Sequence, residues 1–409
     1  MGFKSEGAFF RKMEYKKLGE IADITKLAGF EFTKYVTYIP DGDIIAIRAL
    51  NLKNGRLALD DVKRISVDVS KSLPRSQLRK YDIVLSYTGT VGESAQIMED
   101  NLYHLAPNVA KVTPDTSKVN PVYLFQYIRS PEFKQEMLNY AHGSTQMTIP
   151  MKVIRELSVP VFNMDMQNSI ASVLASLDDK IALNARINDN LQQQADAIFS
   201  ENFSLQELLP VGWRKSYLSS IAKYLNGLAM QKYRPAQGEN GLPVLKIKEL
   251  RQGMTDDNSE RCSANIKPEY IVHDGDIIFS WSGSLLVDFW CGGDCGLNQH
   301  LFKVTSMQFE KWFIYAWTKH YLDYFIAVAA DKATTMGHIK RDELDKAEVI
   351  IPSSSDYMKI GSLMQPLYDK IISNRIESRK LSELRDALLP RLMSGELDVS
   401  GVILEDANQ

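Results

Sequence analysis

The longest regular pattern in the chain is an apolar stripe with alternating spacings of four and three residues. It runs through residues 165–203, and no proline or glycine interrupts the stretch from Met164 to Glu201. This spacing places the apolar side chains on one face of a long helix and is typical of coiled coils. One helix cannot bury such a stripe alone, so we expect a partner helix. The main positions of the first stripe are Ile170, Leu174, Leu177, Ile181, Asn184, Leu191 and Ile198.

A second stripe with the same spacing lies 190 residues further along the chain. Polar residues recur together with this stripe, since Leu177-Asp179-Lys180-Ile181 matches Leu367-Asp369-Lys370-Ile371. Two unrelated surface helices would explain the stripes but not the shared polar residues. We therefore expect a duplicated chain whose two helices pair antiparallel, because a globular segment connects them. The main positions of the second stripe are Ile360, Met364, Leu367, Ile371, Asn374, Leu381 and Leu388.

Two asparagines, Asn184 and Asn374, occupy equivalent positions in the two stripes. A buried polar residue in a helical seam costs stability but fixes the register of the pair. The alternative is that both asparagines are exposed on a frayed seam.

The segments that precede the stripes also resemble each other. Residues 15–57 and 215–255 both read as a short helix, a loop and a strand closed by a glycine turn. Residues 82–90 and 276–284 both place an apolar strand before an aromatic residue, a glycine and small hydroxyl residues. A plain hairpin turn and a ligand-facing loop are both compatible with that pattern.

These repeats predict an α+β fold, in which two related globular domains are separated by a long antiparallel two-helix coiled coil. The arrangement is a tandem duplication, for which we expect pseudo-two-fold symmetry. The expected segments are a first globular domain over 1–163, a first long helix over 164–209, a second domain over 210–352, a second helix over 353–395 and a tail over 396–409.

Charge is distributed unevenly along the chain, although the net charge is only −3. Residues 1–163 carry 22 basic and 18 acidic side chains, whereas residues 164–209 carry 2 and 7. The globular domains are therefore neutral to basic, which permits a local phosphate-binding face. The three cysteines indicate neither a disulfide framework nor a complete zinc site, so no metal is expected. No signal peptide or membrane span is evident, and we expect a cytoplasmic protein.

Motifs that would indicate catalysis are missing from the sequence. There is no P-loop, no Gly-x-Gly-x-x-Gly, no His-Glu-x-x-His and no nucleophile elbow. No two prolines are adjacent, which excludes the Asn/Asp-Pro-Pro-aromatic loop with which amino-methyltransferases hold their target base. We expect a non-catalytic chain without catalytic residues, whose chemistry is supplied by a partner.

The two junctions between domain and helix resemble those of the specificity subunits of type I restriction–modification systems. The first junction runs from Val159-Pro160 through Gln167 to Leu177-Asp178-Asp179-Lys180-Ile181, and the second from Ile351-Pro352 to Leu367-Tyr368-Asp369-Lys370-Ile371. The stretch from Leu388 to Leu397 is similar too. Met358 departs from the pattern, because it stands where the family has glutamine.

The resemblance implies a DNA specificity subunit with two target recognition domains, each of which reads half of a bipartite site in double-stranded DNA. It also implies that the helices space the domains and dock two methyltransferase subunits, so that the chain forms part of a DNA adenine methyltransferase or restriction endonuclease complex. S-adenosylmethionine would then bind the methyltransferase, and ATP and magnesium a restriction subunit where one is present. No cofactor is expected on this chain itself.

Candidate DNA-binding residues lie on loops at the strand ends. Hydroxyls and aromatics suit phosphates or base faces, amides suit adenine in the major groove, and cations suit phosphates. Ordinary surface polarity explains any single one of them equally well. The candidates are Arg48, Lys53, Tyr87, Thr88, Thr90, Asn108, Ser144, Thr145, Gln146, Lys246, Lys248, Trp281, Ser282, Ser284, Asn298, Gln299, His300, Thr334, Thr335 and His338.

A second hypothesis is a non-catalytic coiled-coil scaffold whose domains bind proteins and have no DNA specificity. Salt dependence distinguishes the two, because binding to phosphates weakens steeply with added salt whereas an apolar protein interface does not.

Overall fold

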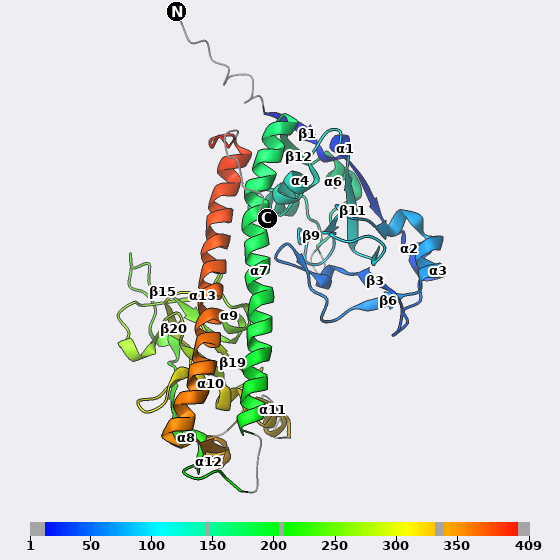
Figure 1. Ribbon diagram of the computed structural model, residues 1–409. Helices are drawn as coiled ribbons and strands as arrows, with labels where there is room; N and C mark the ends of the chain where they lie inside the picture. The colour runs from blue at the N-terminus through cyan, green and yellow to red at the C-terminus, as the bar shows by residue number, and fades with distance from the viewer. Residues whose placement is uncertain (1–12, 144–146, 204–207, 332–338, 340, 400–409) are drawn as a thin grey trace, which may run out of the picture. The chain divides into compact units, whose positions relative to one another are not determined.

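The structure is a computed structural model of the 409-residue chain. It describes residues 13–143, 147–203, 208–331, 339 and 341–399 (Figure 1). The chain forms two compact units. The first contains residues 1–179 and 382–409, and the second contains residues 180–381. Each unit consists of one globular lobe together with a segment of both long helices.

The first lobe contains two four-stranded sheets and a short strand pair. One sheet has the strand order β2-β11-β8-β9, the other has the order β6-β3-β10-β7, and β1 pairs with β12. The elements are β1 (Glu14–Lys17), α1 (Leu18–Ile21), β2 (Ala22–Lys26), α2 (Gly29–Tyr35), β3 (Ile44–Ile47), β4 (Leu52–Lys53), β5 (Arg56–Leu57), β6 (Lys63–Ile65), α3 (Val67–Ser72), β7 (Gln77–Leu78), β8 (Ile83–Ser86), β9 (Ser94–Gln96), β10 (Tyr103–Leu105), β11 (Val109–Pro114), α4 (Pro121–Ile128), α5 (Pro131–Asn139), α6 (Met151–Glu156) and β12 (Ser158–Val161).

The second lobe repeats this topology. Its sheets have the orders β14-β21-β18-β19 and β16-β15-β20-β17, and β13 pairs with β22. The elements are β13 (Arg214–Tyr217), α8 (Leu218–Ile221), β14 (Lys223–Asn226), β15 (Leu242–Leu245), α9 (Ile247–Gln252), β16 (Arg261–Cys262), β17 (Ile271–Val272), β18 (Ile277–Ser280), β19 (Leu286–Phe289), β20 (Cys295–Leu297), β21 (Leu301–Thr305), α10 (Lys311–His320), α11 (Leu322–Asp331), α12 (Asp342–Lys346) and β22 (Glu348–Ile351).

The two lobes differ where elements are added to this common frame. The first lobe carries α2, α3 and the short hairpin β4–β5, whereas the second carries α9 after β15. The one parallel contact of each second sheet is preserved, since β3 pairs with β10 and β15 pairs with β20. The predicted duplication is therefore confirmed at the level of strand order.

The predicted long helices are α7 (Met164–Phe203) and α13 (Ser354–Met393). They run antiparallel (Figure 1). In the first unit, Arg385 of α13 contacts Asp178 of α7. In the second unit, the Asn184 side chain of α7 donates hydrogen bonds to Glu377 and Ser378 of α13. The predicted antiparallel helical pair is thus present in both units.

The side chains of the two predicted stripes are all buried or half-buried in the structure. Asn184 and Asn374 are both buried. Asn184 donates to the Asn374 carbonyl oxygen at 3.4 Å, and the Asn374 amide donates to Asn188 at 2.9 Å. The asparagines therefore hydrogen-bond across the seam and are not exposed on a frayed edge.

The helices complete the hydrophobic core of each lobe. Ile170 and Leu174 of α7 and Leu389 of α13 belong to the core of the first lobe. Phe199 of α7 and Ile360 of α13 belong to the core of the second. Strands β8 and β18 are buried on both faces, because one face meets the helices and the other meets the second sheet. This explains why both strands read as continuous apolar runs.

The two lobes dock on the helices with different chemistry. In the first unit the Asp178 carboxylate accepts hydrogen bonds from Gln126, Arg129 and Arg385 at 2.8, 2.8 and 2.7 Å. In the second unit Tyr368 occupies the position equivalent to Asp178, and its ring packs on Tyr315 with centroids 5.0 Å apart. At this position one lobe therefore meets the helices through a largely buried ion cluster and the other through aromatic packing, while Arg375 and Arg379 of α13 make ion pairs with the second lobe elsewhere.

Candidate nucleic-acid interface

Three loops of the first lobe meet beyond the end of β8. The Tyr87 N–H donates to the Asn108 carbonyl at 3.2 Å, and the Ile149 N–H donates to the Tyr87 carbonyl at 2.9 Å. The Gly89 N–H donates to the Met147 carbonyl at 2.9 Å. Residues far apart in the sequence are thus joined around Tyr87, as the predicted loop group requires.

The second lobe has the same arrangement beyond β18. The Trp281 N–H donates to the His300 carbonyl at 3.4 Å, and the Ile339 N–H donates to the Trp281 carbonyl at 3.1 Å. We call residues 87–92, 107–108 and 147–149 of the first lobe, and residues 281–285, 298–300 and 339 of the second, the loop clusters. They share one backbone frame but carry different side chains.

The candidate side chains of the clusters differ in how much of their surface is exposed. Those with little surface left for a ligand are Tyr87, Thr88, Ser282 and Asn298. Thr90, Asn108 and Ser284 are exposed, and Gln299 and His300 are half-buried.

The aromatic residue of each cluster is held by its neighbours. The ring of Trp281 stacks on Phe302 with centroids 5.7 Å apart, and its indole N–H donates to Asn226 Oδ1 at 2.9 Å. Burial raises the pKa of the Tyr87 hydroxyl, so this group is protonated at neutral pH. In the structure both rings anchor the clusters; the Tyr87 ring is buried, whereas the Trp281 ring is half-buried.

The polar side chains at the entry to β21 bond to one another. His300 Nδ1 and Ser282 Oγ are 3.0 Å apart, and His300 Nε2 lies 3.3 Å from the Gln299 amide nitrogen. The His300 N–H donates to Asn298 Oδ1 at 3.3 Å. In the first lobe the residue at the position of His300 is Asn108, with a backbone φ of 73°. At the same backbone position the first lobe therefore carries the amide of Asn108, and the second lobe carries the imidazole of His300 next to the amide of Gln299.

Three of the four candidate cations are paired with acidic or carbonyl oxygens. Arg48 binds Asp61 at 3.2 Å, and its guanidinium also donates to the Asp61 carbonyl. Lys246 pairs with Glu260 at 2.7 Å, and Lys248 pairs with Asp256 at 3.1 Å.

The fourth candidate cation, Lys53, is exposed at the end of β4. The neighbouring Asn54 N–H donates to Glu93 Oε2 at 3.3 Å, which places this hairpin beside the loop that connects β8 and β9. The remaining candidates lie outside the described residues: Ser144, Thr145, Gln146, Thr334, Thr335 and His338.

Two residues that contact the clusters were not among the sequence candidates. The Lys26 ammonium lies 5.4 Å from the centre of the Tyr87 ring, and Asn226 binds the Trp281 indole. They occupy equivalent positions at the ends of β2 and β14, at the same offset of 200 residues that relates the two opening segments. That offset was the available signal, but it did not distinguish these side chains from other polar residues.

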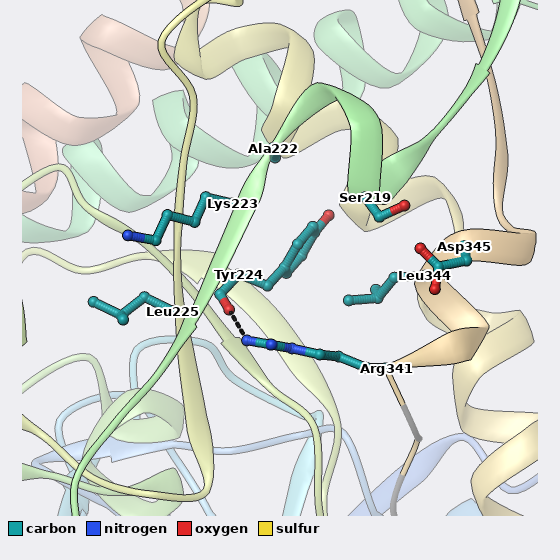
Figure 2. A pocket seen from close by; sticks show the side chains of 8 residues that line it. All are labelled: Ser219, Ala222, Lys223, Tyr224, Leu225, Arg341, Leu344 and Asp345. Atoms are coloured by element: carbon teal, nitrogen blue, oxygen red, sulfur yellow. Dashed lines mark hydrogen bonds between the residues drawn. The ribbon is translucent and has the colours of Figure 1, made fainter.

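A cavity of about 320 Å³ in the second lobe lies between β14 and α12 (Figure 2). Arg341 extends across it, and its guanidinium donates to the Tyr224 carbonyl at 2.8 Å. In the first lobe Arg155, from a different position near the end of α6, donates to the corresponding carbonyl of Ile24 at 2.6 Å. Because both lobes contain this tie between helix and strand, we assign Arg341 a structural role.

The described residues contain no group of histidine, cysteine or acidic side chains that would hold a metal ion. Burial raises the pKa of Cys291 to about 11 and that of Cys295 to about 12. Both thiols are therefore protonated at neutral pH, whereas a cysteine that binds zinc does so as a thiolate. Within the part of the chain that the structure describes, none of the helices combines the length and apolarity that a bilayer span requires.

Comparison with known proteins gives a consistent result. The family model described as "Type I restriction modification DNA specificity domain" matches residues 11–193 and again residues 210–384. The MjaIX specificity subunit of a type I restriction enzyme from Methanocaldococcus jannaschii is 28% identical over 307 residues, which cover 68% of this chain and 69% of that protein. The HindI specificity subunit from Haemophilus influenzae is 22% identical, with coverage of 90% and 96%.

Among solved structures, the S subunit of a type I restriction–modification system from M. genitalium superposes with a TM-score of 0.57. It is 15% identical, and the match covers 93% of this chain and 96% of that one. That likeness supports the fold.

The two family matches cover most of the chain, so the protein belongs to the family of type I restriction–modification DNA specificity subunits. Subunits of this family are non-catalytic and act in complexes with DNA and with other subunits. The prediction of a DNA specificity subunit is thereby confirmed over the alternative of a scaffold without DNA specificity.

Proposed function

We propose that each lobe reads one half of a bipartite site in double-stranded DNA. The single observation that supports this best is the matched backbone frame of the two loop clusters. Tyr87 and Trp281 make the same two backbone hydrogen bonds in their lobes. Different side chains surround these bonds, as two readers of different half-sites require.

We further propose that α7 and α13 dock two methyltransferase subunits of the complex. The helices repeat each other in sequence and therefore offer two related surfaces. Outward-facing apolar residues on them include Leu183, Leu363 and Leu384, which are exposed at 42%, 53% and 47%. S-adenosylmethionine would bind those subunits. ATP and magnesium would bind a restriction subunit if one joins the complex, and this chain would bind no cofactor.

A methylation assay tests both parts of the proposal. The purified chain is combined with its cognate methyltransferase subunit and S-adenosylmethionine, and methylated adenines are mapped on genomic DNA. We expect methylation at one split sequence and none with either protein alone. Methylation of the same sequence by the methyltransferase alone would contradict the assignment of specificity to this chain.

A second assay tests whether the lobes act separately. The exposed cluster residue Asn108 of the first lobe is changed to alanine, and methylation is mapped again. We expect relaxed preference in one half-site and an unchanged preference in the other. Equal loss of preference in both half-sites, with the protein still folded, would contradict the assignment of one half-site to each lobe.

A further inference from the structure

The loops after β8 and β18 have the same order of residue types in the two lobes, although the proposed half-sites differ. Asp82–Thr90 and Asp276–Ser284 share the order of apolar strand, serine, aromatic, hydroxyl, glycine and hydroxyl. Residues that distinguish two different base sequences should themselves differ. A loop that both lobes share should contact what both half-sites have in common, and that is the sugar–phosphate backbone.

A buried serine sets the direction of the peptide groups in each loop. Ser86 Oγ donates to the Thr90 carbonyl, and Ser280 Oγ donates to the Ser284 carbonyl at 2.9 Å. Both serines are fully buried. The carbonyl oxygens, which would repel a phosphate, are therefore held toward the interior in both lobes.

The N–H groups of Thr90 and Ser284 in these loops are left for a ligand. Among the described residues, nothing accepts a hydrogen bond from the backbone N–H of Thr90 or of Ser284. Both residues are exposed, as are the preceding glycines Gly89 and Gly283, whose φ angles are 83° and 64°. Successive backbone N–H groups around a left-handed residue form a concave donor site that suits anions. In the first lobe the Gly89 N–H is already bonded to Met147, so the Thr90 N–H is the donor that remains there.

Lysine residues occur in the segments that contact each loop. In the first lobe, the hairpin that carries Lys53 is bonded to Glu93 at the far end of the loop. In the second lobe, a Cβ atom on Gly283 would lie 3.7 Å from Ile247, which stands between Lys246 and Lys248. Lys246 and Lys248 are already paired with Glu260 and Asp256, so the N–H donors are the main reason to expect an anionic ligand.

From these observations we propose that the loops after β8 and β18 bind backbone phosphates of DNA, with the N–H and hydroxyl groups of Thr90 and Ser284 as donors. This inference rests on the proposed function and refines it. Base reading then falls to the parts in which the lobes differ, namely α2 and α3 of the first lobe, α9 of the second, and the side chains at Asn108 and His300.

The test adds one negative charge to a loop without removing a folded contact. Ser284→Glu is compared with Gln308→Glu, which makes the same charge change at an exposed position outside the loop clusters of the same lobe. Binding of the chain with its methyltransferase subunit is measured on three duplexes: the methylated site, the site with the second half-site scrambled, and a random sequence. Each measurement is repeated over a range of salt concentrations.

We expect Ser284→Glu to weaken binding to all three duplexes by the same factor, roughly three- to tenfold. The slope of log affinity against log salt should become shallower by about 1, and the base preference of both half-sites should not change. Gln308→Glu should alter neither quantity by a comparable amount. Ser284→Lys should do the reverse of Ser284→Glu and strengthen binding to all three.

Two results would overturn the inference. One is a changed base preference in the second half-site while affinity for the random duplex stays constant, because the loop would then read bases. The other is unchanged affinity on every duplex, because the loop would then not touch DNA. If the unmodified complex itself shows no sequence preference, the proposed function fails, and that outcome is distinct from both. Unchanged tryptophan fluorescence of Ser284→Glu verifies that the second lobe is folded.

Discussion

The carboxylate of Asp178 in α7 and the guanidinium of Arg385 in α13 form a 2.7 Å ion pair, although 207 residues separate them in the sequence. Arg129 of the first lobe binds the other oxygen of the same carboxylate. This cluster joins three elements: the lobe, the first helix and the second helix. At the equivalent position of the second lobe Tyr368 packs on Tyr315, and the ion pairs of that lobe with α13 are made by Arg375 and Arg379.

Replacing Arg385 should loosen the first lobe on its helices. The side chains of Asp178 and Arg385 are exposed at only 21% and 13%, so Arg385→Ala leaves a largely buried carboxylate with one fewer partner. We expect a loss of about 3 kcal/mol in local stability. Hydrogen exchange of α4 and of residues 164–179 measures it.

Asp196→Asn is the control, because Asp196 also lies on α7 and the substitution weakens a more exposed ion pair, with Lys319 of α10. Its cost should stay below about 1 kcal/mol. Equal protection factors in the two variants would show that the cluster does not hold the lobe.

The contribution of Asp178 should depend on pH. Burial raises the pKa of this carboxyl, but Arg129, Gln126 and Arg385 together lower it by more than burial raises it. The folded-state pKa therefore lies below the usual 3.8. A depressed pKa gives stability that is present above the unfolded value and is lost as the pH falls through the folded value. The stability difference between the wild type and Asp178→Asn should therefore be full at pH 6 and shrink below about pH 4.

Urea unfolding at several pH values measures this difference, with hydrogen exchange in α4 as the readout for the first lobe. The same comparison for Tyr368→Phe in the second lobe should show no change with pH over the acidic range, because burial raises the pKa of that phenol. A difference for Asp178→Asn that is constant from pH 6 to pH 3 would contradict the linkage.

Gly361 of α13 should not tolerate alanine. A Cβ atom there would lie 3.0 Å from Nε1 and 3.3 Å from Cε2 of Trp312, a fully buried side chain of α10. Alanine favours a helix over glycine by about 1 kcal/mol, but overpacking a core costs about 1–3 kcal/mol. We expect a net loss of stability in the second lobe, measured by urea unfolding with tryptophan fluorescence.

All five tryptophans of the chain, among them Trp312, lie in the second lobe, so the fluorescence reports that lobe alone. Ser362→Ala, at the adjacent exposed position, should leave the midpoint nearly unchanged. A Gly361→Ala variant more stable than the wild type would show that helix propensity outweighs the packing clash.

Lengthening both helices should change the preferred spacer between the half-sites. Shortening α13 is not a clean test, because Arg375 and Arg379 dock the second lobe through Asp288 and Asp274. One heptad is instead inserted after Ile181 and one after Lys380, which preserves the seam because seven residues complete two turns of the coiled-coil repeat. The helical pair grows by about 10 Å, or at most about three base pairs at roughly 3.4 Å each.

We expect a longer preferred spacer, unchanged half-sites and weaker binding, because three base pairs also rotate the duplex by roughly 100°. Methylation of sites that differ only in spacer length measures this. Insertion into α7 alone, which displaces the seam, is the control and should abolish methylation. Full activity of the doubly extended protein on the original spacer would show that the helices do not set the distance.

The sequence by itself determined the elements whose signal is local or repeated. The alternating spacing of Ile170, Leu174 and Leu177 predicts α7 because a helix places such residues on one face. The recurrence of the polar residues at Asp369 and Lys370 predicts that α13 is its relative. The strand that ends at Ser86 and the strand that ends at Ser280 follow from continuous apolar runs, since a strand buried on both faces needs no alternation.

Only the tertiary structure decided which side of each loop faces outward. Tyr87 and Thr90 stand three residues apart with similar hydrogen-bonding groups, yet Tyr87 is buried and Thr90 is exposed. Likewise, nothing local in the sequence shows that Asp178 meets Arg129 and Arg385 whereas the equivalent Tyr368 meets Tyr315. Burial and ion pairing depend on which distant segments pack together, and the pattern of a single segment does not contain that information.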